Sequence, residues 1–322
     1  MGNIRHPRRG SLQYWPRARS SKHAARVRAW ATTKEQKLLG FIGYKVGMTH
    51  LLVKETNPNS PRKNMDVFTP VTVVECPPLK VLSVRYYRDN DESAAAVVTE
   101  VFSKKVEKRL TRKTGYATKE TTPPTAFDGV KVVVYTQPWL TGVGKKKPDL
   151  VELGVGGKTL AEQSAFALSL LDKEVRVTEV VKEFQLVDVH GVTKGKGFSG
   201  VVKKFGVKLL HHKSEKGVRG IGTMGSWHPN RVQFSVPQAG KWGYLLRTDY
   251  NKLTLKVGSK PVEINPKGGF VRYGLVKSDY VLLKGSVPGP AKRPVTFVDA
   301  IRPQEKVHPA TITYTSVESK QR

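Results

Sequence analysis

Short apolar runs rich in β-branched and aromatic residues recur along the chain, and Gly, Pro and Asn separate them. Such runs bounded by turn-forming residues are typical of β-strands. Three lie in the first third of the chain and five lie later, at residues 38–55, 68–76, 79–87, 183–192, 243–250, 252–258, 269–289 and 293–301. Because many glycine-punctuated strands favour a closed barrel over an open parallel sheet, the pattern predicts a mainly β protein built around a barrel.

Residues 88–182 have a different texture. They contain the apolar runs AAAVVTEVF and VKVVVYTQP and one helix signal, in which Thr159 and Glu162 form a capping box before AFALSLL. Residues 80–187 carry 18 basic and 14 acidic side chains, more than half of the 26 acids in the chain. The segment is therefore predicted to be an inserted α/β lobe with an ordinary, balanced protein surface.

The N-terminal segment, residues 1–34, shows no apolar period of either helix or strand. The first 30 residues hold eight Lys or Arg and no acid, with Tyr14, Trp15 and Trp30 interleaved among the arginines. A free segment of this composition is expected to be disordered. Arginines with scattered aromatic rings suit phosphate contact combined with base stacking.

Residues 191–248 form a second segment without a globular pattern. They contain 11 glycines, 11 Lys or Arg, and Glu215 as the single acid. Like charges repel in a compact state, and each glycine loses more backbone freedom on folding than other residues do. We therefore expect a polyanion to order this segment, as RNA orders disordered basic chains.

The whole chain has the same bias, with 56 Lys and Arg against 26 acids, a net charge of +30 and a pI of about 10.2. This imbalance indicates nucleic acid or an anionic membrane as a partner. Nucleic acid is favoured, because no apolar run approaches the roughly 20 residues of a spanning helix. No secretory signal or myristoylation pattern is seen, and a single cysteine excludes an internal disulfide framework. We expect a cytoplasmic protein, with the balanced lobe turned partly away from the polyanion.

Two motifs resemble catalytic or metal sites without completing them. GVGGKT at residues 154–159 ends like a phosphate-binding loop, but Glu152 stands where the motif requires glycine. His211 and His212 would point to opposite faces of a strand, and no further ligand completes a metal site. Cys76 precedes two prolines and is expected to be a small buried residue. We find no acid–base set, and predict neither catalytic residues nor metal or cofactor.

Trp227 is the aromatic residue for which a functional contact is most strongly indicated. Most tryptophans are core residues, but the neighbours of this one, from Gly225 to Asn230, offer no apolar period that would bury it. Glycines at 220, 222 and 225 allow a narrow, protruding loop. An aromatic ring at its tip can stack on a base, which contributes roughly 1–3 kcal/mol.

Five segments in order resemble the universal large-subunit ribosomal protein L-three family. They are FIGYKVGMTH (41–50), PVTVVE (70–75), VDVHGVTKGKGFSGVVKKFG (187–206), GSWHPNRVQFSVPQAGKWGY (225–244) and VLLKGSVPGPAKRPVTF (281–297). The N-terminal segment and the long insertion look like the archaeal and eukaryotic branch. Since the C-terminal extension of eukaryotic members is missing, the archaeal type is expected.

The resemblance implies a split β-barrel of the type found in translation proteins, with an extended basic N-terminal tail and a long Gly-rich internal loop. It implies an N-terminal extension at 1–37, a barrel core at 38–87 and 183–303 with an RNA-penetrating loop at 194–242, an inserted lobe at 88–182 and a C-terminal tail at 304–322. It further implies early binding to 23S-type ribosomal RNA. The loop tip, formed by Ser226, Trp227, His228 and Pro229, would lie near the peptidyl transferase centre.

The predicted RNA contacts are the basic and aromatic side chains of these segments. They are Arg5, Arg8, Arg9, Trp15, Arg17, Arg19, Lys22, Arg26, Arg28, Lys45, Lys194, Lys196, Lys203, Lys204, His211, His212, Lys213, Arg219, Trp227, His228, Arg231, Lys241 and Arg247. The expected partners are large-subunit ribosomal RNA and neighbouring ribosomal proteins, with one copy per ribosome, no membrane and no small-molecule substrate. Two alternatives remain: an RNA-modifying or nucleotide-hydrolysing enzyme, and a translation or assembly factor that binds reversibly.

Overall fold

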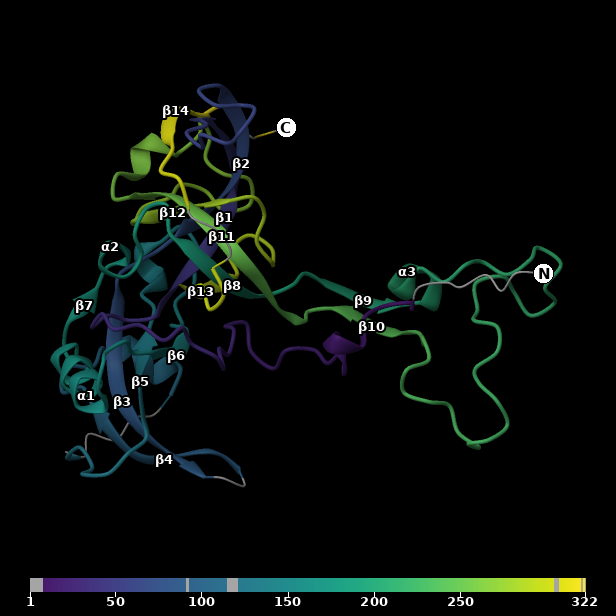
Figure 1. The fold of residues 1–322 in the computed structure, drawn as a ribbon, viewed down its shortest axis with the longest axis horizontal. Coiled ribbons are helices and arrows are strands. Elements are labelled where there is room, and N and C mark those ends of the chain that lie inside the picture. Colours follow the sequence, from purple (N-terminus) through teal and green to yellow (C-terminus); the bar gives the residue numbers. More distant parts are fainter. Residues whose placement is uncertain (1–7, 91–92, 115–120, 304–306, 320, 322) are drawn as a thin grey trace. The chain divides into compact units, whose positions relative to one another are not determined.

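The computed structural model describes residues 8–90, 93–114, 121–303, 307–319 and 321. The chain divides into two compact units, which are described separately (Figure 1). The extension unit comprises Met1–Ser21 and Thr193–Leu246, and the main unit comprises Lys22–Val192 and Arg247–Arg322. The fold is mainly β. No helix in the described ranges is long and apolar enough to cross a membrane.

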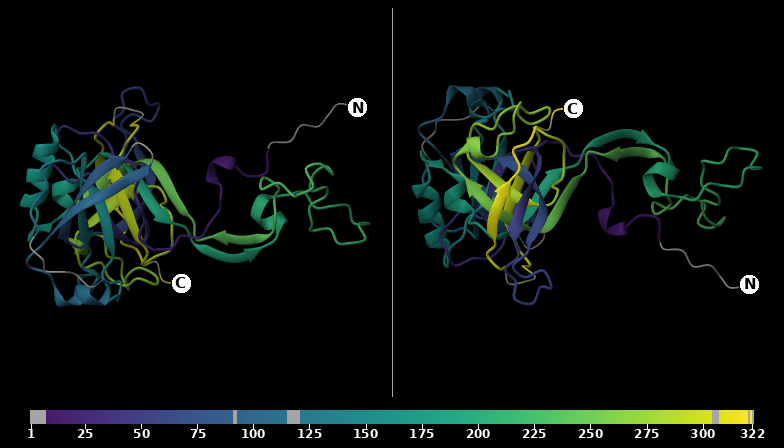
Figure 2. Two further views of the ribbon diagram at one scale, coloured as in Figure 1. Left: turned by 90° about the horizontal axis from the view of Figure 1, so that it is seen from below. Right: turned by 90° about the horizontal axis from the view of Figure 1, so that it is seen from above.

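The first sheet of the main unit closes on itself (Figure 2). Its strands are β1 (Gly40–Lys54), β2 (Asp66–Glu75), β8 (Leu186–Val192), β11 (Leu246–Gly258), β12 (Tyr280–Lys284), β13 (Pro294–Asp299) and β14 (Thr311–Thr315). They follow the order β13-β8-β11-β12-β2-β1-β14, and β13 also pairs with β1. The strands from β13 to β1 therefore form a ring, and β14 adds to the second half of β1.

The strands of this ring have buried residues on both faces. In β12, Tyr280 and Leu282 belong to one hydrophobic cluster, whereas Val281 and Leu283 belong to another. This division follows from the alternation of side chains along a strand. Because both faces are covered, the strand reads as a continuous apolar run in the sequence.

The second sheet has the order β4-β3-β5-β6, with β7 paired to β3. Its strands are β3 (Leu79–Asn90), β4 (Ser93–Phe102), β5 (Gly129–Tyr135), β6 (Leu150–Gly154) and β7 (Glu174–Val175). The helical segments of the main unit are η2 (Lys108–Arg112), η3 (Pro138–Leu140), α1 (Leu160–Ser169), α2 (Val177–Val180) and η4 (Pro261–Glu263), where η denotes a 3₁₀-helix.

Helix α1 and the 3₁₀-helix η2 cover opposite faces of this second sheet. Val132 and Val134 of β5 share a hydrophobic cluster with Ala167 of α1. The intervening Val133 packs instead with Leu110 of η2. Because successive side chains of β5 point to opposite faces of the sheet, α1 packs on one face and η2 packs on the other.

The capping signal at Thr159 correctly predicted the start of α1. The Thr159 hydroxyl accepts a hydrogen bond from the Glu162 amide at 3.2 Å. The Glu162 carboxylate reaches back to the Lys158 amide at 3.1 Å, one residue before the N-cap. Both contacts satisfy amide donors that a helix N-terminus leaves without partners.

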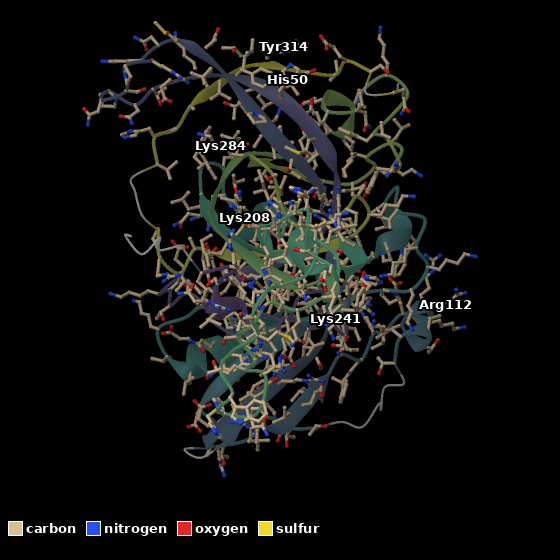
Figure 3. The ribbon with its side chains drawn as sticks, turned by 90° about the vertical axis from the view of Figure 1, so that its right-hand side faces the viewer. His50, Arg112, Lys208, Lys241, Lys284 and Tyr314 are labelled. Atoms are coloured by element: carbon tan, nitrogen blue, oxygen red, sulfur yellow. The ribbon has the colours of Figure 1, made fainter. Side chains whose placement is uncertain are left out.

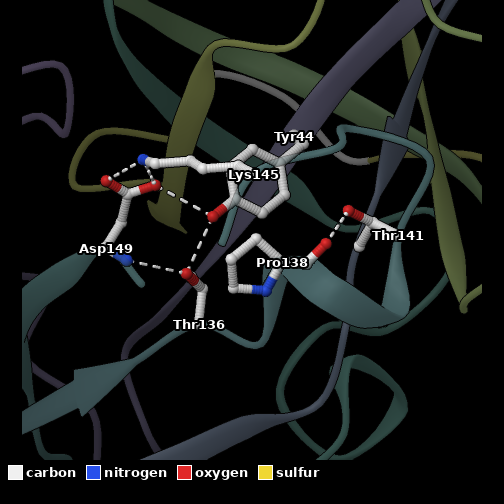
Figure 4. A network of polar contacts seen from close by, with 6 residues as sticks. All are labelled: Tyr44, Thr136, Pro138, Thr141, Lys145 and Asp149. Atoms are coloured by element: carbon white, nitrogen blue, oxygen red, sulfur yellow. Dashed lines mark hydrogen bonds and ion pairs between the residues drawn. The ribbon is translucent and has the colours of Figure 1, made fainter. Parts of the chain in front are cut away.

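A buried polar network joins β1 to the loop between β5 and β6 (Figure 4). The Tyr44 hydroxyl lies 2.8 Å from Thr136 Oγ1 and donates to Asp149 Oδ2 at 2.9 Å. The Lys145 ammonium pairs with Asp149 at 2.6 Å. Burial, followed by the Asp149 charge, raises the pKa of Tyr44 well above its usual value, so the phenol stays protonated as a donor. The network therefore fixes the loop that carries η3.

Aromatic rings meet across β1, β2 and β14, where Phe68 and Tyr314 are exposed and His50 is half-buried. The His50 ring stacks on Phe68 with centroids 4.6 Å apart, and Tyr314 lies 6.4 Å away. Figure 3 shows the labelled His50 and Tyr314 next to each other. Cys76, in contrast, is fully buried at the end of β2, as predicted. Burial raises the pKa of its thiol, so it is unsuited to nucleophilic chemistry.

Part of the N-terminal segment packs into the main unit, contrary to the expectation of a disordered segment over residues 1–34. Ala25 and Val27 are buried, and Trp30 packs against the main hydrophobic cluster. A Cβ added at Gly154 would lie 2.7 Å from the Trp30 ring, so the close approach requires glycine there. The expectation was wrong because spaced single residues find their apolar partners only in the tertiary structure.

The extension unit contains short regular elements. They are η1 (Leu12–Tyr14), β9 (Gly195–Ser199), α3 (Val201–Phe205) and β10 (Gly240–Gly243). Strands β9 and β10 pair antiparallel. Gly243 has a φ of +73°, and an added Cβ would lie 2.1 Å from the Lys194 carbonyl oxygen. Glycine is therefore required where the chain enters and leaves this hairpin.

Replacing Trp30 with alanine is expected to lower the free energy of unfolding by about 3 kcal/mol, because a large packed ring leaves a cavity. Urea unfolding followed by circular dichroism measures the change. Trp227→Ala is the matched control and should change stability by no more than about 0.5 kcal/mol, since that ring is exposed. Equal effects of the two substitutions would contradict the packing described here.

Candidate nucleic-acid interface

The extension unit has almost no internal means of neutralising its charge. It contains 15 of the 56 Lys and Arg residues of the chain but only one of the 26 acids, Glu215. Its cations use backbone carbonyls instead: Arg8 donates to Ser235 O at 2.9 Å, and Arg9 donates to Gly206 O at 2.8 Å. A neutral acceptor leaves the positive charge uncompensated, so the surface stays strongly attractive to anions.

An aromatic cluster holds the N-terminal segment against the loop within this unit. The rings of Trp15 and Phe205 are stacked with centroids 6.4 Å apart, and Phe234 meets Trp15 edge-on at 5.9 Å. The Arg17 guanidinium lies 4.7 Å from the Trp15 ring centroid and 5.0 Å from that of Phe205. Cation–π contacts of this kind contribute about 0.5–1 kcal/mol at exposed sites.

A basic hollow of about 480 Å³ opens beside this cluster. It is lined by Trp15, Pro16, Arg17, Arg19, Phe198, Lys204, Phe205, Ala239, Gly240 and Lys241. Burial lowers the pKa of the Lys204 ammonium, and the charges of Arg17 and Lys241 lower it further. A bound phosphate would relieve this repulsion, and the rings offer surfaces on which a base can stack.

The predicted loop tip is fully on the surface. Trp227 is 78% exposed. Ser226, His228 and Pro229 are also exposed. Gly225 has a φ of +138°, a conformation that favours glycine. The exposure agrees with the expectation that Trp227 lies outside the core, while its contact with RNA stays a prediction.

Most other predicted contacts of the extension unit also present their side chains to solvent. Exposed residues of this set are Arg8, Arg9, Arg19, Lys194, Lys196, Lys203, His211, His212, Lys213, Arg219, Arg231 and Lys241. The Lys196 ammonium lies 3.8 Å from the Trp242 ring centroid. The structure therefore brings Trp15, Arg17, Arg19, Lys204 and Lys241 to one hollow and spreads the remaining residues along the loop.

The two adjacent histidines are not placed on opposite faces. They lie in a turn, where the ring centroids of His211 and His212 are 4.1 Å apart. The strand geometry assumed from the sequence was wrong, because no strand forms here. Across the described ranges, no group of three or more His, Cys, Asp or Glu side chains is arranged to hold a metal.

Five predicted contacts belong to the main unit. Lys22, Arg26 and Arg28 are exposed, and Arg247 is half-buried. The Lys45 ammonium donates to the Val287 and Gly289 carbonyls at 2.7 and 3.0 Å. These bonds give Lys45 an internal structural role. Arg5, which was also predicted to bind RNA, lies outside the described residues.

Sequence reasoning missed the phenylalanines that build the hollow. Phe198 is 78% exposed, and Phe205 packs on Trp15. The interleaving of Phe with Lys and Gly in KGFSGVVKKF was an available signal, since aromatic residues among cations are typical of nucleic-acid surfaces. Phe234 gave no such signal, because its partner Trp15 is far away in sequence.

The chain was compared with known protein families and proteins. The model of the family described as Ribosomal protein L3 matches residues 1–122 and 125–321. The chain belongs to this family. The matched segments include both the ring of strands and the extension unit, so family membership covers the candidate interface as well as the fold.

Archaeal relatives are similar over nearly the whole chain. A protein named large ribosomal subunit protein uL3 from Methanocaldococcus jannaschii is 44% identical over 99% of this chain and 98% of the relative. A protein of the same name from Archaeoglobus fulgidus is 44% identical over 98% of each chain. The chain is an archaeal-type member of the ribosomal protein L3 family.

Replacing Phe205 with alanine is expected to release the N-terminal segment within the extension unit, because it removes the ring that stacks on Trp15 and faces Arg17. Aromatic pairs contribute about 0.5–1.5 kcal/mol, so trypsin should cleave after Arg17 and Arg19 about tenfold faster in the RNA-free protein. Mass spectrometry of early digestion products measures these rates. Phe198→Ala, at an exposed ring of the same unit, should leave the rates unchanged. Equal acceleration by both would rule out a specific anchoring role for Phe205.

Proposed function

We propose that this protein is a structural constituent of the large ribosomal subunit that binds 23S-type ribosomal RNA, supports early assembly and braces the region near the peptidyl transferase centre. The observation that carries the proposal is the extension unit, with 15 basic residues against one acid. Relatives that share almost the full chain are named as large-subunit ribosomal proteins, which is consistent with this role.

The layout expected from the sequence is part of the proposal. The strand ring serves as a split β-barrel of the translation-protein type, formed by residues 38–87 and 183–303. Residues 1–37 form the basic N-terminal extension, 88–182 the inserted lobe and 304–322 the C-terminal tail. The loop at 194–242 enters RNA. Several strands of the ring carry buried residues on both faces, so the ring is taken as the stable part of this layout.

The role within this proposal is electrostatic and positional. Lysines and arginines neutralise phosphates that crowd where RNA helices meet, and this contribution weakens as salt increases. The hollow at Trp15 and Lys204 would take a nucleotide, and Trp227 would stack on RNA near the peptidyl transferase centre. Members of this family are structural proteins rather than enzymes. Reaction chemistry is therefore assigned to the RNA, and the protein works at the ribosome in the cytoplasm.

Sedimentation of ribosomes through a high-salt cushion tests residency. A structural constituent stays with the large subunit after the wash, whereas a reversible translation or assembly factor is released into the supernatant. Immunoblotting of the tagged protein in both fractions gives the result. Release of most of the protein would overturn the proposal in favour of the factor.

Deleting residues 1–21 should weaken binding to a 23S-type transcript and flatten its salt dependence. The deletion removes five arginines, and each neutralised phosphate contributes about 0.7–0.9 to the slope of log K against log salt, so the slope should fall by up to about 4. The packed residues Ala25, Val27 and Trp30 are retained, so the main unit should melt unchanged.

The matched control keeps the full length and replaces the same five arginines with glutamine. If the slope of log K against log salt falls in both the deletion and the glutamine variant, the effect is due to the charge of the arginines. If neither variant changes the slope, the N-terminal segment does not contact phosphate and this part of the proposal fails.

A further inference from the structure

A second basic hollow lies on the inserted lobe of the main unit. Its volume is about 340 Å³, and Arg109, Arg112, Trp139 and Lys146 line it. Clefts that bind small ligands have volumes of about 300–1,000 Å³, so the volume of this hollow lies near the lower end of that range. Among the residues that the structure describes, its lining consists of three cations and one indole ring. The balanced composition of the lobe as a whole conceals this local excess of charge.

The geometry of η2 places both arginines on one side. In a 3₁₀-helix, side chains three residues apart are eclipsed, so Arg109 and Arg112 project together. Leu110 between them is fully buried with Leu82 and Val133 and anchors the helix to the sheet. Figure 3 shows Arg112 at the outer edge of the structure. Both arginines are exposed, and the buried Leu110 holds the helix that carries them.

Trp139 also lines the hollow and is already paired with a cation. The Arg109 guanidinium lies 4.6 Å from the Trp139 ring centroid. The indole ring and the guanidinium plane are both surfaces of the kind on which unpaired bases of RNA stack. Trp139 belongs to η3, and the Thr141 hydroxyl donates to the Pro138 carbonyl at 2.7 Å, closing this turn (Figure 4).

Asp149, which lies three residues after Lys146 in the sequence, is already engaged. Both carboxylate oxygens of Asp149 lie 2.6 Å from the Lys145 ammonium, and one also accepts from Tyr44. Burial lowers the pKa of the neighbouring Lys113, the charge of Asp149 raises it, and the charges of Lys145, Lys147 and Lys22 lower it. Several lysines therefore act electrostatically on Lys113, and the direction of its pKa shift shows that their repulsion and burial outweigh the attraction of Asp149.

We propose that this hollow is an additional RNA-binding site, in which an unpaired base stacks on the Arg109–Trp139 pair while Arg112 and Lys146 contact adjacent phosphates. The proposal rests on the proposed function, because it takes ribosomal RNA as the polyanion. RNA is favoured over a protein partner, since an aromatic–guanidinium platform beside exposed cations matches a base with its phosphates.

The decisive variant is Arg112→Gln with Lys146→Gln, because both side chains are exposed and their loss should not affect folding. The probe is an archaeal 23S-type rRNA transcript, and binding to the full-length chain is titrated over a series of salt concentrations. Each lost phosphate contact removes about 0.7–0.9 from the salt slope, so the double variant should lose about 1.4–1.8.

The matched control is Lys158→Gln with Lys173→Gln. These lysines are exposed and flank α1, which covers the opposite face of the sheet, and the net charge changes by the same amount. The control should keep the wild-type slope. Equal slopes for the two double variants would overturn the proposed site. A wild-type chain with no salt-dependent binding would instead overturn the proposed function itself.

The stacking component has a separate test. Trp139→Leu keeps apolar volume but removes the aromatic face, and should weaken binding about tenfold, whereas Trp139→Phe should restore most of the affinity. Ultraviolet cross-linking of assembled large subunits should also yield an RNA adduct on the tryptic peptide 132–145. If the leucine variant fails to fold, the salt slope of the Arg112→Gln, Lys146→Gln variant and the cross-linking result still test the proposed site. Cross-links from this peptide to a protein neighbour, without an RNA adduct, would overturn the site.

Discussion

Repulsion among cations is the constraint on which the organisation of this chain depends. The main unit holds most of the acids and forms ion pairs such as Lys37–Asp299 at 2.8 Å and Lys145–Asp149 at 2.6 Å. The extension unit has one acid, and its arginines instead donate hydrogen bonds to carbonyl oxygens and lie over aromatic rings. Those contacts fix the positions of the cations while leaving their charges available to an external anion. The two units thus have different sources of order.

Local patterns in the sequence were sufficient to predict much of the main unit. Buried strands such as β2 and β13 appear as apolar runs because neighbouring elements cover both faces, and α1 follows from the Thr159 cap. The packing of Trp30 on Gly154 could not be predicted, because it depends on two segments separated by more than a hundred residues. Single apolar residues in a basic segment carry no period, so their burial becomes visible only in three dimensions.

The candidate site likewise has one feature that local sequence predicts and another that depends on the tertiary structure. Charge is additive along a sequence, and therefore the basic character of the loop could be predicted from composition alone. The aromatic cluster beside the hollow could not be predicted in this way, since Trp15, Phe205 and Phe234 are far apart in sequence and meet only in the tertiary structure. Lys45 shows what composition cannot reveal: this lysine of a family motif was predicted to bind RNA, and its ammonium also donates to two carbonyls of the main unit.

The inserted lobe shows why net charge is a poor guide to where a polyanion can bind. Exposed charges separated by more than about 8–10 Å are largely screened at physiological salt, so a surface responds to its local cluster rather than to its total. Glu100 and Glu152 form ion pairs with Arg85 within the sheet, and Asp149 forms an ion pair with Lys145. What remains at η2 is positive, although the lobe as a whole is nearly balanced. The fold, by pairing some charges internally, decides which of the others can act outside.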